Sequence, residues 1–164
     1  MRFIKTFFIG TIATFIIGDI TSAANTADPV VGTWVINLAK SKYSSPDRVP
    51  KSQTRTYTQS ADGTSLSIQT VTADGASTTQ QSTFRYDGKP YAFTGSSLYD
   101  SLTLKQVDTH TVKSTQWKDG KETGETTRVL SADGKAMSVT TTGKDAKGMP
   151  YRDESVYDRK QPSR

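Results

Sequence analysis

Along most of the chain, hydrophobic and polar residues alternate with the period of two that places one face of a β-strand against a core. Leu66 and Ile68 fall on one face of such a segment, and Met137 and Val139 fall on one face of another. No stretch keeps its apolar residues at the helical spacing of 3.6, and only residues 38–43 suit a single helical turn. The pattern therefore predicts an all-β protein.

Turn signals separate these segments at short intervals. The dipeptide Asp-Gly tolerates the positive φ of a tight hairpin turn, and it occurs at 62–63, 74–75, 87–88, 119–120 and 133–134. The segments between these turns are rich in Thr, Val and Tyr, which suit a pleated surface. This spacing is typical of an antiparallel sandwich or barrel, and it predicts strands at 32–37, 51–60, 64–72, 76–87, 89–94, 101–108, 110–118, 121–131, 135–143 and 149–158.

The predicted strands form one domain at residues 30–160, an antiparallel up-and-down β-barrel of about ten strands. Segment 38–50 contains two prolines and is expected to cross one end of the sheet as a loop. Residues 25–29 are interpreted as a short linker and residues 161–164 as a disordered tail.

The first 24 residues have a different composition from the rest. Arg2 and Lys5 precede an apolar run from Thr6 to Gly18, and Ser22-Ala23-Ala24 offers the small side chains that signal peptidase accepts. The run is shorter than the roughly 20 residues that a spanning helix needs. We therefore expect a signal peptide at residues 1–24 with cleavage after Ala24, and a secreted or periplasmic mature protein without a membrane span.

Composition narrows the classes of function. The 164 residues contain no cysteine, and the hydrophobic fraction of 33% is low for a globular protein. The interior of a ten-strand barrel must then include Thr, Ser and Gln, which suits a hydrated cavity or a ligand of mixed polarity. The formal charge of +5 is not clustered, and the basic residues are not interleaved with aromatic ones as in single-strand nucleic-acid binders. We expect no nucleic-acid partner.

Three short motifs resemble those of a known superfamily. Gly32-Thr33-Trp34 resembles the Gly-x-Trp of lipocalins and fatty-acid-binding proteins, the calycins. Residues 116–123, Gln-Trp-Lys-Asp-Gly-Lys-Glu-Thr, are similar to the Trp-Asp-Gly-x-Glu-Thr hairpin of fatty-acid-binding proteins, with Lys118 inserted. Residues 156–159, Val-Tyr-Asp-Arg, are similar to their closing Ile-Tyr-Glu-Lys. Residues 32–43 also resemble a group of uncharacterised secreted bacterial lipocalin-like proteins.

The resemblance implies roles for individual residues. Trp34 would close the bottom of the barrel, Gly32 would allow close packing there, and Arg152 or Arg159 would stack on the indole. Tyr157 would offer its hydroxyl to a ligand, whereas Ser155 replaces the arginine that meets a carboxylate in fatty-acid-binding proteins.

Arg128 lies close to the position of a second carboxylate-binding arginine of that family. The inserted Lys118 leaves two alternatives for Arg128, the inward or the outward face of its strand. If Arg128 faces inward, fatty-acid-like anions are the expected ligands; if it faces outward, neutral amphiphiles are. Phe84 and Tyr86 share a face of the strand predicted at 76–87, and we expect them to contribute to the same pocket.

The sequence contains only weak signals for a catalytic or metal-binding site. Asp108 and His110 fall where a hairpin turn is expected, and turns attract polar residues in any case. The acidic residues do not have the spacing of a calcium loop. We expect no enzymatic activity, no cofactor and no metal.

These features together predict an extracytoplasmic, monomeric binding protein that holds a small apolar or amphipathic molecule in a barrel cavity. The alternative is a non-enzymatic interaction module that uses the barrel as a rigid platform for a cell-envelope protein. Loop 94–101 and the threonine-rich strand surfaces would serve that role.

Overall fold

The computed structural model describes residues 28–145 and 147–161. The predicted signal peptide (1–24) lies outside these residues, as do positions 25–27 of the predicted linker and positions 162–164 of the predicted tail.

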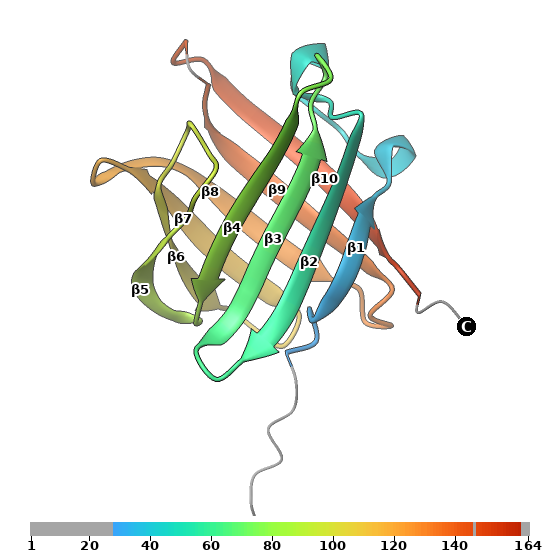
Figure 1. Ribbon diagram of the computed structural model, residues 1–164, viewed down its shortest axis with the longest axis vertical. Coiled ribbons are helices and arrows are strands. Elements are labelled where there is room, and N and C mark those ends of the chain that lie inside the picture. The colour runs from blue at the N-terminus through green and yellow to red at the C-terminus, as the bar shows by residue number, and fades with distance from the viewer. Residues whose placement is uncertain (1–27, 146, 162–164) are drawn as a thin grey trace, which may run out of the picture.

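Ten antiparallel strands form one sheet that curves into a nearly closed barrel (Figure 1). They are β1 (Gly32–Ile36), β2 (Ser52–Ser60), β3 (Gly63–Val71), β4 (Ser77–Phe84), β5 (Asp87–Ala92), β6 (Ser101–Gln106), β7 (Thr111–Lys118), β8 (Lys121–Leu130), β9 (Ala136–Lys144) and β10 (Pro150–Arg159). Most strands pair with their neighbours in sequence, and β1 also pairs with β10. This up-and-down arrangement confirms the predicted all-β fold class.

The barrel is least complete between β4 and β5. No ladder joins β4 to β5, and β4 is bridged only to the chain just after β5, where Gln81 and Thr94 exchange backbone hydrogen bonds of 3.2 and 2.9 Å. The Ser82 hydroxyl adds a bond of 2.8 Å to the carbonyl of Ala92. The ladder of backbone hydrogen bonds is therefore interrupted here, whereas the other neighbouring strands have continuous pairing or a single register shift.

One predicted strand is shorter than expected. The segment predicted at 76–87 ends at Phe84, and Tyr86 lies in the connection to β5. The Asp87-Gly88 dipeptide starts β5 instead of forming the turn, and a register shift follows between Asp87 and Pro90. Gly88 has a φ of 77°, which suits glycine and supports this irregular start.

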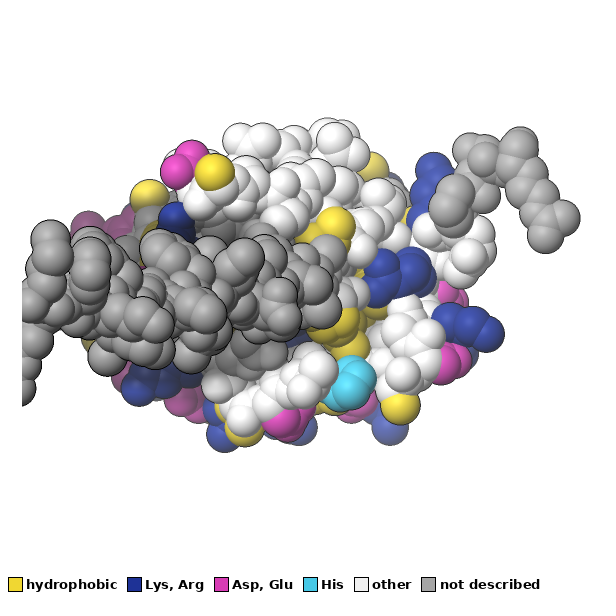
Figure 2. Space-filling view, turned by 90° about the horizontal axis from the view of Figure 1, so that it is seen from below, with side chains coloured by type: hydrophobic (Ala, Val, Ile, Leu, Met, Phe, Trp, Pro, Cys, Tyr) yellow, Lys and Arg dark blue, Asp and Glu magenta, His cyan; other side chains and the backbone are white. Residues whose placement is uncertain are grey.

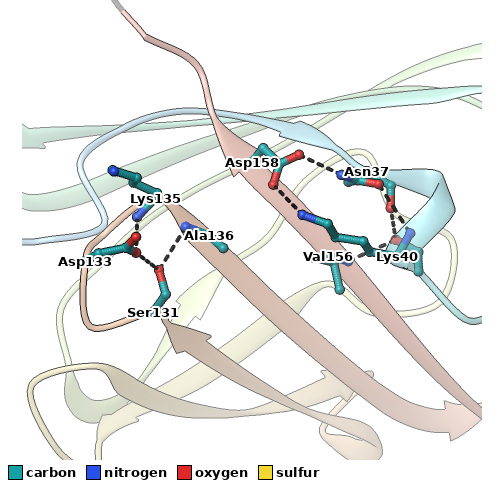
Figure 3. Close-up of polar contacts among 9 residues, drawn as sticks. Asn37, Lys40, Ser131, Asp133, Lys135, Ala136, Val156 and Asp158 are labelled. Atoms are coloured by element: carbon teal, nitrogen blue, oxygen red, sulfur yellow. Dashed lines mark hydrogen bonds and ion pairs between the residues drawn. The ribbon is translucent and has the colours of Figure 1, made fainter.

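The chain between β1 and β2 forms two short 3₁₀ turns, η1 (Leu38–Lys40) and η2 (Pro46–Arg48), at the upper end of the barrel in Figure 1. Polar contacts hold η1 against β10 (Figure 3). Asn37 caps η1 by accepting from the backbone N–H of Lys40 and donates to Asp158 at 2.7 Å, and Lys40 pairs with the same carboxylate. The predicted single helical turn is η1.

The lower end of the barrel, formed by residues 28–31 and the turns β2–β3, β6–β7 and β8–β9, is closed by side chains. Trp34 is fully buried, and its Nε1 donates to the carbonyl of Val30 at 2.8 Å. The guanidinium of Arg159 lies 4.1 Å from the centre of the indole ring and donates to the carbonyl of Val31 at 2.7 Å. A Cβ at Gly32 would approach Arg159 Nη1 to 2.7 Å, so glycine makes room for this stack.

Seen from below, the described part of this end carries Lys and Arg side chains beside Asp and Glu, with hydrophobic groups between them (Figure 2). No helix in the described residues is both long enough and apolar enough to cross a membrane.

Candidate functional site

Above the closed end, the barrel contains a partly open cavity of about 280 Å³. Its apolar wall comes from inward-facing positions of several strands: Leu66, Ile68, Phe84, Leu102 and Val139. The upper margin is formed by the segment around η2, the β3–β4 turn and the β5–β6 loop. The volume lies near the lower limit of ordinary small-molecule pockets.

The polar part of the cavity contains three arginines, which come from different elements of the fold. Arg48 belongs to η2, Arg55 to β2 and Arg128 to β8, and all three line the cavity. Buried guanidinium groups need charge or hydrogen-bond partners because leaving water is costly for an ion. The partners of each arginine therefore decide what the cavity can bind.

Arg128 faces inward because the pairing of β7 with β8 shifts at one point. Thr123 is the extra residue on β8, opposite the junction between Gln116 and Trp117. A bulge of this kind changes which face the following side chains occupy. Arg128 then lies across from the buried Val112 and is itself only 7% exposed.

The guanidinium of Arg128 belongs to a chain of polar groups at the lower end. Its Nη2 donates to the Tyr86 hydroxyl at 3.0 Å, and that hydroxyl donates to the carboxylate of Asp28. Asp28 also accepts from the Thr64 hydroxyl at 3.2 Å and from the backbone N–H of Val30 at 3.0 Å. Burial raises the pKa of Tyr86 above its usual range, so the phenol remains a donor.

Arg55 has a different environment. Its Nε donates to the Tyr157 hydroxyl at 3.0 Å and lies 3.4 Å from Gln53 Oε1, and the Tyr157 hydroxyl donates to the same amide oxygen. Burial by itself lowers the pKa of Arg55, but the neighbouring phenols of Tyr157 and Tyr57 outweigh it, and the net shift is upward. The group is therefore charged at any physiological pH.

Arg48 is neutralised within the protein. Its Nε donates to Asp153 Oδ2 at 2.6 Å, and its guanidinium lies 3.5 Å from the centre of the Tyr151 ring. The other oxygen of Asp153 accepts from the backbone N–H and the hydroxyl of Ser44, each at 2.9 Å. Asp153 on β10 thus ties the segment around η2 across the upper end of the cavity.

The four residues expected to contact a ligand divide into two groups. Phe84 and Arg128 line the cavity. Tyr157 is fully buried, and both Tyr157 and Tyr86 lie behind the cavity wall, where their hydroxyls bond to the arginines. Arg55 was missed by the sequence analysis. The alternation of β2 offered the signal, because Arg55 shares the inward face with Tyr57.

The remaining chemical candidates lie on the surface. Asp108 and His110 are exposed in the β6–β7 turn, where Asp108 accepts backbone N–H bonds of 2.8 Å from His110 and Thr111. These bonds lower the pKa of Asp108 and stabilise the turn. Among the described residues, no group of three or more His, Asp and Glu is arranged to hold a metal ion.

The class of protein is therefore an all-β, up-and-down barrel of ten antiparallel strands with a mixed polar and apolar cavity. No model of a known protein family matches the chain, and neither does any curated protein or solved structure that was compared with it.

Proposed function

We propose that the protein binds a small amphipathic molecule reversibly inside its barrel, in an extracytoplasmic compartment. The proposal rests on one observation, the cavity of about 280 Å³ whose lining combines apolar strand residues with the guanidinium groups of Arg55 and Arg128. A wall of this composition suits a ligand with an apolar body and a polar end. The barrel is consistent with a calycin-like fold, and we propose that the chain is a calycin similar to secreted bacterial lipocalin-like proteins.

Occupation of the cavity can be tested with a pair of matched variants. Ser114 on β7 lines the cavity, and its neighbour Thr115 has the opposite orientation because successive strand residues alternate. Ser114→Phe should fill the cavity and weaken binding of a fluorescent fatty-acid probe by about tenfold or more, a loss of about 1.4 kcal/mol. Thr115→Phe should leave the dissociation constant close to that of the wild type.

Thermal unfolding of both variants should be followed in parallel, because overpacking of the interior costs about 1–3 kcal/mol. If the wild-type protein binds neither a fatty-acid probe nor an uncharged analogue at micromolar concentration, the proposal is wrong. Non-denaturing mass spectrometry after exposure to cell-envelope extract adds an independent result. A bound small molecule supports the cavity, and a protein without a small molecule that captures another protein favours the platform alternative.

A further inference from the structure

This inference rests on the proposed function and specifies the chemistry of the ligand. We propose that the ligand carries a single acidic group and that Arg55, rather than Arg128, recognises it. The three arginines of the cavity differ in how their charges are compensated.

Two of the three cavity arginines already have an acidic partner in the protein. Arg48 pairs directly with the buried Asp153 at 2.6 Å. Arg128 is joined to Asp28 through the Tyr86 hydroxyl, which accepts from the arginine and donates to the carboxylate. Each of these positive charges is therefore balanced by a carboxylate of the same chain, and neither needs a ligand for its compensation.

Arg55 has no acidic partner within salt-bridge distance in the described part of the chain. Its hydrogen bonds there are both made by Nε, to Tyr157 and Gln53, and its ring contact is with the same tyrosine at 4.9 Å. Neutral groups orient the guanidinium but do not cancel its charge. A positive charge inside a barrel without a counter-charge favours an incoming anion.

The orientation of Arg55 leaves its donors available to a ligand. Nε is held on the side of β10. Nη1 and Nη2 make no hydrogen bond of good geometry with any described residue, and the neutral Tyr57 phenol is a further, weaker partner of the guanidinium. Nη1 and Nη2 both retain access to solvent, and the residue lines the cavity. Two parallel N–H donors on a planar fork match the two oxygens of a carboxylate.

The size and wall of the cavity limit the rest of the molecule. One uncompensated charge matches a monoanion better than a phosphate dianion. Ile68 lies directly across from Arg55 in the pairing of β2 with β3, and Leu66 and Phe84 continue the apolar wall. With about 280 Å³ available, a short or compact amphipathic carboxylate fits this combination.

The test compares two ligands of equal chain length, octanoate and octanol, by displacement of a fluorescent probe. Wild-type protein should prefer octanoate, and Arg55→Gln should weaken octanoate by about tenfold or more while changing octanol little, since hydrogen bonds to charged groups contribute about 1.5–3 kcal/mol. The matched control is Arg152→Gln, which removes the same charge from the exposed face of β10.

A second measurement does not depend on the folding of any variant. The ¹⁵Nε resonance of Arg55 in the wild-type protein should shift on addition of octanoate and remain in place on addition of octanol. If Arg55→Gln and the wild type show the same ratio of affinities, or if the Arg55 resonance does not respond to octanoate, the inference is overturned and cavity binding stands. If neither octanoate nor octanol binds, the proposed function fails with it.

Discussion

At the scale of single residues, two tyrosine hydroxyls orient two of the arginines in the cavity. Tyr157 and Tyr86 each place a hydroxyl against a guanidinium, at 3.0 Å in both cases. A phenol satisfies a donor of the arginine while remaining neutral, so it fixes the orientation of the cation without removing its charge. The group beyond the phenol differs between the two arginines: it is an amide oxygen of Gln53 for Arg55 and the carboxylate of Asp28 for Arg128.

The two tryptophans should differ in their effect on stability. Trp34 is fully buried, donates to Val30 and stacks with Arg159, whereas Trp117 is only partly buried, and its Nε1 has no partner among the described residues. Trp34→Ala should lower the free energy of unfolding by about 3–5 kcal/mol, and Trp117→Ala should lower it by less. Urea denaturation measures both. A larger loss for Trp117→Ala would contradict the assignment of the lower end as the closed end of the barrel.

Among the elements, the segment between β1 and β2 depends on one buried carboxylate of β10. Asp153 accepts three bonds from this segment, two from Ser44 and one from Arg48. Asp153→Asn should therefore cost about 1–3 kcal/mol, because it removes charge-assisted bonds from a largely buried site. It should also accelerate hydrogen exchange of backbone amides in residues 41–49.

The exposed pair of Asp158 and Lys40 supplies the control for that prediction. Their side chains are 52% and 61% exposed, so screening by water leaves the pair little effect on stability. Asp158→Asn should leave exchange in residues 41–49 near that of the wild type. Equal exchange rates in Asp153→Asn and wild-type protein would show that Asp153 does not hold the segment.

At the level of strands, most of the fold follows from local chemistry. Alternation and Asp-Gly turns predict all ten strands, and four of the five Asp-Gly dipeptides lie at hairpin turns. The exception, Asp87-Gly88, arises where β4 and β5 separate, so the chain there is not a tight hairpin. The local sequence does not predict that Arg128 faces the cavity, because the face of β8 on which it lies depends on the bulge at Thr123 and on pairing across strands. Tyr157, one of the two partners of Arg55, comes from a strand about a hundred residues away, which no local pattern indicates.

Across the whole molecule, several phenols are buried or partly buried in the interior of the barrel. Burial raises the pKa of Tyr99 to about 12, and it also raises the pKa values of Tyr86 and Tyr157. The cost of placing a phenolate in a poorly solvated interior is the common cause. These residues connect the closed end of the barrel, the cavity wall and the β5–β6 loop, so their ionisation tests the packing of the entire interior.

Stability should consequently decrease at alkaline pH. In the unfolded chain the phenols ionise near pH 10, whereas in the folded protein Tyr99 retains its proton until about pH 12. Because the folded state then binds more protons than the unfolded state, the free energy of unfolding is unaffected below pH 10 and falls as the pH rises toward 12. Each phenol that ionises only in the unfolded chain contributes a slope of about 1.4 kcal/mol per pH unit. Urea denaturation at intervals between pH 8 and 12 measures the slope.

The variant Tyr99→Phe isolates one phenol from the lysines that titrate over the same range. The ring of Tyr99 packs against Phe93 with centroids 4.6 Å apart, and phenylalanine preserves that contact. Below pH 10 the wild type and the variant should have similar free energies of unfolding. Above pH 10 the difference between them should change in favour of the variant by up to about 1.4 kcal/mol per pH unit. Parallel pH profiles for the two proteins would mean that the Tyr99 phenol is solvated in the native state, and that the β5–β6 loop does not close over the cavity wall.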